Sequence, residues 1–396
     1  MRRLQNNNST KFILCIFLSL ILILGNISFV KADELDLNCK SAILIDAASG
    51  EVIVEKNPHE KLPPASVTKV MTMLLIMEAL DSGKITLEDK VTISKQSESK
   101  NSEGTMLLLE AGEVRTVHEL LLGIAVESAN DACIAMSEYI SGSEDEFVKL
   151  MNKRAQELGM NDTNFMNPNG LHEDGHVTSA YDIALMSREL VKHQKIFDYI
   201  SKYMVDVYVG KKNNVLRSLT NKNKMIRFYE GFIDGIKTGY TRQAMYCISL
   251  SAKKNNLRLI SVIMGAPDVP IRTKEAKKLL DYGFANYSSY SVAKSGDVIT
   301  ELPVSKGDKN NIKIVSNKEI SVLIKKGEDK SIRKEIKLPE ILVAPIEKNQ
   351  QIGEMLIYKD DKEIAKFPLV SSIDVNKSSF IVNLRKSLEY WFGTNK

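Results

Sequence analysis

The stretch that decides the fold is a proline pair followed by a short polar segment, Pro63-Pro64-Ala65-Ser66-Val67-Thr68-Lys69. Proline lacks a backbone N–H and disfavours the helical region for the residue before it, so we expect a helix to begin after the pair. The run Val70–Leu80 behind it is apolar on nearly every side. That pattern is typical of a helix buried in the centre of a domain.

The first turn of this predicted helix carries Ser66 and Lys69 three residues apart, and therefore on one face. A hydroxyl at the positive end of a helix, with an amine one turn away, is a workable nucleophile and base. An ordinary helix start is the alternative. The amine can act as a base only when it is neutral, and free lysine titrates near ~10.4. We therefore expect burial and a second cation nearby to lower the pKa of Lys69.

The Ser-x-x-Lys pattern is not specific without its context. It also occurs in polar stretches or at turns, at Ser97, Ser251, Ser291 and Ser331. None of these has a buried apolar helix behind it, so the context selects Ser66.

The N-terminal segment 1–32 has the features of a secretory signal peptide. Basic residues precede an apolar run from Phe12 to Leu24, and Ala32 is a small residue suited to cleavage. An uncleaved anchor is the alternative, although the run is short for a membrane span. The segment holds four bases and no acids, so its removal lowers the formal charge from +4 to 0. A neutral remainder gives no indication of nucleic-acid binding.

Three cysteines remain after this segment, Cys39, Cys133 and Cys247, and their spacing matches no metal site. We interpret Cys133 and Cys247 as small buried apolar residues. A disulfide at Cys39 has no support in the sequence.

A second polar pair interrupts a helical pattern. Residues 117–139 are apolar at helical spacing but contain Ser128 and Asn130 at a break. Buried polar groups are costly unless they are paired. Either the pair forms a turn that caps the following helix, or both side chains line a cleft.

A loop is predicted for residues 161–176, which are rich in Asn, Gly and Asp. Within it, His172 and His176 match the zinc-protease pattern His-Glu-x-x-His. That pattern binds zinc only on a helix. Turn-forming pairs at Asn169-Gly170 and Asp174-Gly175 disfavour a helix here, so we predict no metal site.

A buried hairpin is predicted for residues 231–265, with Lys237, Thr238 and Gly239 at the start of its first strand. Gly239 allows another backbone or a ligand to approach the strand closely. A buried Lys237 is costly without an anionic partner.

The C-terminal third changes character. Residues 288–370 are short β-rich runs between charged turns, which predicts a small all-β domain, and residues 371–376 read as a linker. Phe380, Leu384, Leu388 and Trp391 then form a helical stripe in a tail, 377–396, of net charge +3. A basic amphipathic helix with an aromatic anchor suits a membrane surface. A helix packed on the β domain is the alternative.

Taken in order, Ser66–Lys69, Ser128–Asn130 and Lys237–Gly239 resemble the triple signature of penicillin-binding proteins and serine β-lactamases. The surrounding sequence resembles the low-molecular-weight D-alanyl-D-alanine carboxypeptidases over about residues 40–285. The resemblance implies an α+β fold, with a transpeptidase-like domain over 33–285 and a small β domain over 286–372. An amphipathic membrane-associating helix over 373–396 follows, and no cofactor is needed.

The resemblance also implies roles for individual residues. Ser66 would attack the peptide bond between the terminal D-alanines of a peptidoglycan stem peptide, with Lys69 as base and Ser128 as proton relay. The substrate-binding residues would be Asn130, Lys237, Thr238, Gly239 and Tyr240. β-Lactams would acylate Ser66. The enzyme would act outside the cytoplasmic membrane, attached peripherally to it.

Two rival functions share these motifs. A class A β-lactamase uses a loop glutamate to activate the deacylating water, and Glu157 has a suggestive spacing to Asn161. A catalytically silent penicillin-binding scaffold is the other rival, although retention of all three motifs argues against it.

Overall fold

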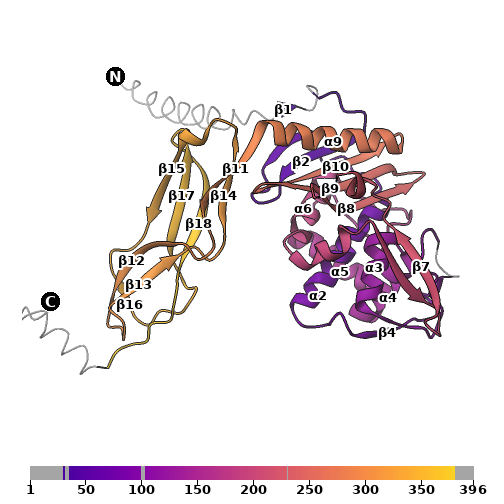
Figure 1. The fold of residues 1–396 in the computed structure, drawn as a ribbon, viewed down its shortest axis with the longest axis horizontal. Coiled ribbons are helices and arrows are strands. Elements are labelled where there is room, and N and C mark those ends of the chain that lie inside the picture. The colour runs from indigo at the N-terminus through magenta and orange to yellow at the C-terminus, as the bar shows by residue number, and fades with distance from the viewer. Residues whose placement is uncertain (1–29, 32–34, 100–102, 230, 380–396) are drawn as a thin grey trace, which may run out of the picture.

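The computed structural model describes residues 30–31, 35–99, 103–229 and 231–379 (Figure 1). The predicted signal peptide, apart from Val30–Lys31, and the predicted terminal stripe from Phe380 lie outside the described residues. Within those ranges, none of the helices combines the length and the apolar character of a membrane span.

A six-stranded sheet forms the centre of the first domain, in the order β1-β3-β2-β10-β9-β8. Its N-terminal hairpin pairs with a strand from far along the chain, since Ile43 lies opposite Val262. All pairings are antiparallel except that of β1 with β3. The strands are β1 (Val30–Lys31), β2 (Ser41–Asp46), β3 (Val52–Lys56), β8 (Ile233–Thr241), β9 (Met245–Lys254) and β10 (Leu257–Ala266).

Helices cover both faces of this sheet (Figure 1). Because successive side chains of a strand point to opposite faces, Ile43 joins the core beneath one helical layer and Leu44 joins the core beneath α9. The larger layer contains α2 (Lys69–Asp81), α3 (Val117–Leu122), α4 (Asn130–Ser141), α5 (Glu144–Glu157) and α6 (Ala180–Leu190). The other face is covered by α9 (Val269–Asn286).

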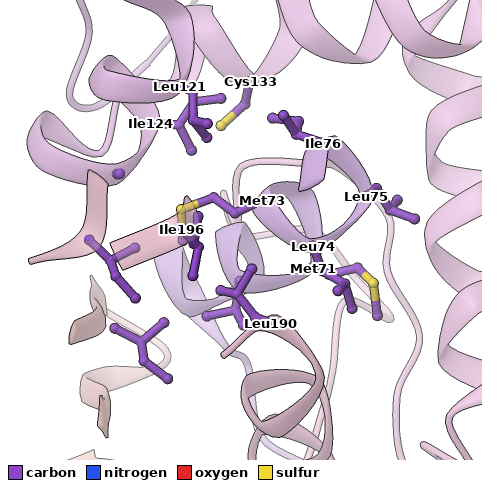
Figure 2. Packing of buried hydrophobic residues seen from close by; sticks show 14 of the residues in the cluster. Met71, Met73, Leu74, Leu75, Ile76, Leu121, Ile124, Cys133, Leu190 and Ile196 are labelled. Carbon is purple, nitrogen blue, oxygen red and sulfur yellow. The ribbon is translucent and has the colours of Figure 1, made fainter. Parts of the chain in front are cut away.

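Helix α2 lies at the centre of the larger core, and every residue from Lys69 to Met77 is buried. Figure 2 shows its apolar side chains pointing outward on several sides, and Leu190 and Cys133 belong to the same buried cluster. A helix surrounded by neighbours has no face for polar residues, which explains the all-round apolar run. The sequence prediction for this helix is confirmed. Cys133 and Cys247 are buried free thiols, and Cys39 is free as well.

Smaller elements complete the first domain. Short hairpins are formed by β4 (Lys90–Thr92) with β5 (Val114–Thr116), and by β6 (Met204–Val209) with β7 (Val215–Thr220). A π-helical turn, Gly123–Glu127, links α3 to the break before α4. The short helices are α7 (Phe197–Ile200) and α8 (Met225–Phe228).

Helix α9 runs directly into the second domain, which is built from strands, as predicted (Figure 1). One two-stranded sheet pairs β11 (Tyr287–Ala293) with β14 (Ile320–Lys325). A six-stranded sheet has the order β15-β17-β18-β13-β12-β16. Its strands are β12 (Val298–Ser305), β13 (Asn311–Val315), β15 (Ile332–Lys337), β16 (Leu342–Val343), β17 (Gln351–Lys359) and β18 (Lys362–Ser371).

The prediction of a linker at 371–376 is wrong. Val375 is 1% exposed and forms a β-bridge with Ile346, and Lys377 forms another with Gly307. The described residues 373–379, assigned by the sequence to the terminal helix, are extended and packed on the β domain. The signal available in the sequence was Val375, an apolar residue in a mostly polar stretch. Burial of its side chain holds the segment in place.

Candidate active site

Ser66 lies in a tight 3-10 turn, Ala65–Thr68, that leads into α2. The sequence placed it in the first turn of the α-helix itself, so this detail differs. Side chains three residues apart eclipse one another in a 3-10 turn, so the expected proximity is kept. The Nζ of Lys69 lies 3.0 Å from the Oγ of Ser66.

Lys69 is fully buried, with 0% of its surface exposed. Its Nζ donates to the Oγ of Ser66, to the Oδ1 of Asn130 at 2.7 Å and to the carbonyl oxygen of Asn169 at 2.6 Å. Burial lowers the pKa of Lys69 to about 8, because charge is disfavoured away from water. The amine is therefore able to exchange a proton with the serine near neutral pH.

The polar pair at the helix break lies beside this amine. Ser128 adopts a left-handed conformation, φ 69°, and its neighbour Ala129 caps α4 without a side-chain hydrogen bond. The Nδ2 of Asn130 donates to the carbonyl oxygen of Glu103 at 2.5 Å, which orients its Oδ1 toward Lys69. Ser128 lines the groove in front of Ser66. Of the two interpretations, the cleft holds for Ser128, whereas Asn130 is buried and does not line the groove.

Strand β8 forms the opposite wall and is the outer strand of the sheet. A Cβ built on Gly239 would lie 3.0 Å from the backbone nitrogen of Ser66 and 3.0 Å from the carbonyl oxygen of Pro64. Only glycine allows this close approach without displacement. The prediction that Lys237 begins the strand is wrong, since β8 starts at Ile233 and Lys237 lies in its middle.

Lys237 is a second buried amine at the site. Its Nζ donates to the carbonyl oxygen of Thr238 at 3.2 Å, and no ion pair links it to any described carboxylate. Burial, followed by the nearby charge of Lys69, holds the pKa of Lys237 well below its ordinary value. For Lys69, burial is the first cause that lowers the pKa. Since repulsion between two ammonium groups is mutual, Lys237 is the second cation that the sequence analysis expects near Lys69.

The loop 161–176 supports the turn from behind. The Oγ1 of Thr72 donates to the carbonyl oxygen of Pro168 at 2.5 Å. At Gly170, φ is +86° and a Cβ would lie 1.9 Å from the carbonyl oxygen of Ala65. Glycine is required there on both counts. The carbonyl oxygen of Asn169 in this loop accepts a hydrogen bond from Lys69, a contact that the sequence analysis missed.

His176 also has a structural role. Its Nδ1 accepts from the backbone N–H of Met166 at 3.3 Å, so its Nε2 carries the proton and donates to the Oγ1 of Thr68 at 2.9 Å. Burial lowers the pKa of His176 to about 4, which keeps the ring neutral. The segment from His172 is not helical, and the described residues contain no group of three potential metal ligands.

These elements border a groove of about 1060 Å³, lined near the reactive centre by Ser66, Ser128 and Thr238. Arg272 on α9 also lines it, and the sequence analysis did not identify this residue. The side chain of Arg272 is 6% exposed, and its Nε has no hydrogen-bond partner among the described residues. A buried cation with an unpaired Nε, in the groove that Ser66 also lines, indicates an anionic ligand.

Comparison with known proteins places this arrangement in a family. The family model described as D-alanyl-D-alanine carboxypeptidase matches residues 28–268, and that of the penicillin-binding protein 5 C-terminal domain matches residues 287–377. The chain belongs to the D-alanyl-D-alanine carboxypeptidase family. The predictions of a serine-type carboxypeptidase and of an α+β fold with a second β domain are confirmed.

Relatives match the carboxypeptidase over nearly its whole length. It is 44% identical over 362 residues to D-alanyl-D-alanine carboxypeptidase DacF of Bacillus subtilis, covering 91% of this chain and 92% of that one. Identity to DacA of Escherichia coli K12 is 33% over 386 residues, covering 93% and 94%. Penicillin-binding protein 5 from Haemophilus influenzae superposes with a TM-score of 0.71 at 34% identity, covering 86% and 98%.

Glu157, the residue that suggested a class A β-lactamase, has another role in this carboxypeptidase. It lies at the end of α5, is 48% exposed, and pairs with Arg154 at 3.2 Å. A solvent-exposed carboxylate in an ion pair is not suited to activate a water at Ser66. No observation on the structure favours that rival.

Proposed function

We propose that Ser66 is the nucleophile with which this carboxypeptidase removes the terminal D-alanine from peptidoglycan stem peptides. The observation that carries the proposal is the 3.0 Å contact between Ser66 Oγ and a fully buried Lys69 Nζ. A neutral amine at this distance takes the hydroxyl proton as the oxygen attacks the carbonyl carbon. The product of the first step is an acyl-enzyme ester on Ser66.

The backbone N–H groups of Ser66 and Tyr240 are the proposed oxyanion hole for the tetrahedral intermediate. The close approach of Gly239 to the Ser66 nitrogen supports this, because it brings β8 alongside the 3-10 turn. Each such donor is worth roughly 3–4 kcal/mol in the transition state. Ser128 passes the proton to the leaving amine as the C–N bond breaks, and water then hydrolyses the ester.

The carboxylate of the departing D-alanine provides the anion that the buried cations lack. We assign it to Lys237 and Thr238, as the resemblance implies, and add Arg272 because of its unpaired Nε in the groove. Asn130 holds Lys69 through its Oδ1 and would position the substrate amide. Pairing on substrate binding offsets the cost of burying these cations.

Relatives that are named penicillin-binding proteins support the proposal that β-lactams acylate Ser66. We also propose that the enzyme acts on the outer side of the cytoplasmic membrane, where peptidoglycan lies. Export by residues 1–32, the domain limits, and membrane attachment by the tail from Phe380 stay predictions from the sequence.

The test is intact-protein mass spectrometry with benzylpenicillin, together with D-alanine release from a diacetylated tripeptide ending in D-alanyl-D-alanine. We expect one adduct on the wild type, mapped to Ser66, and none on Ser66→Ala. An adduct on another serine would overturn the assignment. Rapid penicillin turnover would favour the β-lactamase, and an adduct without D-alanine release would favour the silent scaffold.

A further inference from the structure

The groove is much larger than a D-alanine needs, and its extra length lies between α8 and α9. One wall is formed by residues from Thr220 to Tyr229, and the other by α9. On α9 the lining residues are Pro270, Thr273, Lys274 and Lys277, together with Val269 and Arg272. The spacing of three, four and seven residues places four of them on one helix face. We call this part of the groove the α8–α9 arm.

The arm lies on the side of the leaving group. The proposed function assigns the terminal carboxylate to Lys237 and Arg272, and the terminal residue is the part that departs. Arg272 belongs to the same wall as Lys274. Any substituent that extends from the departing residue would therefore enter the α8–α9 arm. A methyl side chain would leave most of the groove of about 1060 Å³ unfilled.

The charge of the arm has one sign. No aspartate or glutamate occurs among the described residues that line it, whereas five basic residues do: Lys222, Lys224, Arg272, Lys274 and Lys277. Lys222 pairs with Glu127 at 3.1 Å, and Lys277 pairs with Asp281. Lys224 and Lys274 lie on opposite walls, are exposed, and form no ion pair with the described residues.

Between these cations the surface is largely apolar. Met225 is buried at the base of α8, Phe228 is 70% exposed, and Val269 is exposed on the facing wall. The Nζ of Lys277 lies 5.6 Å from the centre of the Tyr229 ring, so the two walls meet there. An apolar surface between two unpaired ammonium groups is complementary to an aliphatic chain that ends in a carboxylate.

We propose that the α8–α9 arm binds the leaving component of the substrate and selects one that carries a second carboxylate on an aliphatic chain. The chemical class is an acidic D-amino acid, or a peptide amine of that kind, in place of D-alanine. The inference rests on the proposed function, because Arg272 marks the leaving side only if it receives the terminal carboxylate.

The test uses two N-acetylated peptides that end in D-alanyl-D-2-aminoadipate or in its side-chain carboxamide, with a D-alanyl-D-alanine peptide as reference. The two probes are nearly isosteric and differ in one charge. We expect the wild type to favour the acid in kcat/KM by about three- to tenfold, the range that two exposed ion pairs supply. Salt lowers the ratio because exposed charges are screened.

In the double variant Lys224→Gln, Lys274→Gln the acid-to-amide ratio should fall to about one, since its two unpaired cations are gone. The ratio is measured within one protein, so partial loss of folding cancels. Lys90→Gln, an exposed lysine on β4 outside the groove, should keep the wild-type ratio. A wild-type ratio near one, a ratio that survives in the double variant, or cleavage of the reference peptide alone would overturn the inference. Failure to cleave the reference peptide would instead overturn the proposed function.

Discussion

The same four-residue pattern, Ser-x-x-Lys, begins α2 at Ser66 and recurs on strand β9 at Ser251, with different results. At the start of α2, the serine and Lys69 are 3.0 Å apart. On β9, Ser251 is buried and accepts from the Nη1 of Arg258, whereas Lys254 is exposed at the end of the strand. Residues three apart share a face on a helix but point to opposite faces of a strand. The pattern therefore brings the serine and the lysine together only where the backbone is helical.

Burial is the second difference between the two sites. Lys69 is enclosed by α2, α4 and the loop 161–176, so burial lowers its pKa to about 8. Lys254 reaches solvent, where an ammonium group is well hydrated. Geometry brings the amine to the serine, and burial makes the amine able to accept its proton.

The largest effect is expected when the hydroxyl is removed at each site. Ser66→Ala should lower D-alanine release by at least about 10⁴-fold, because no acyl-enzyme forms. Ser251→Ala should change the rate by about twofold or less, since that hydroxyl only accepts from Arg258. Release is measured with a coupled D-amino-acid assay. Comparable losses in both variants would show that the two serines are not distinguished as argued.

A somewhat smaller effect separates charge from basicity. Lys69→Arg keeps a cation near Ser66, but a guanidinium does not give up its proton, so acylation should slow by about 10²–10⁴-fold. Lys254→Arg is the matched substitution at the strand site and should be silent. Acylation rates with a chromogenic cephalosporin measure both. A Lys69→Arg enzyme of near wild-type rate would eliminate the lysine as base.

The pH dependence tests the role of burial. Only neutral Lys69 accepts the serine proton, and its pKa lies at about 8. The acylation rate constant should therefore fall about tenfold for each pH unit below that value and level off above it. Stopped-flow acylation between pH 5 and pH 10 gives the profile. A flat profile through this range would contradict the assignment of Lys69 as base.

The smallest effect is expected from the loop 161–176, whose backbone supports the 3-10 turn at Ser66. Gly170 and Gly175 have nearly the same φ, +86° and +85°. A Cβ at Gly170 would lie 1.9 Å from the Ala65 carbonyl oxygen, whereas at Gly175 the nearest atom is 3.8 Å away. Both Ala variants carry the same backbone strain, so the contact alone separates them.

We expect Gly170→Ala to lower the free energy of unfolding by about 2 kcal/mol more than Gly175→Ala does. Urea denaturation followed by circular dichroism measures the difference. Equal losses would show that the loop does not brace the 3-10 turn.

Much of the fold could be predicted because it rests on local patterns. The all-round apolar run of α2, the break at Ser128 and the loop before His176 were each anticipated from periodicity and turn residues. The errors concern contacts made at a distance. Val375 reads as part of a linker until its pairing with Ile346 is known, and Lys237 reads as a strand start because the preceding glycines resemble a turn.

The same division holds at the candidate site. The motif residues could be named from their order and surroundings, but Arg272 and the carbonyl group of Asn169 could not. Arg272 has an ordinary place in a helix, and a backbone carbonyl carries no sequence signal at all. Their roles arise only from what faces them across the groove.

The order of residues is sufficient for the central helix, for the spacing of Ser66 and Lys69, and for membership of the carboxypeptidase family. Tertiary contacts set the proton affinity of Lys69, whose partners Asn130 and Asn169 lie 61 and 100 residues away along the chain. The physical reason is that local backbone geometry depends on residues that are close in the sequence. Exclusion of water requires distant segments to close around one group.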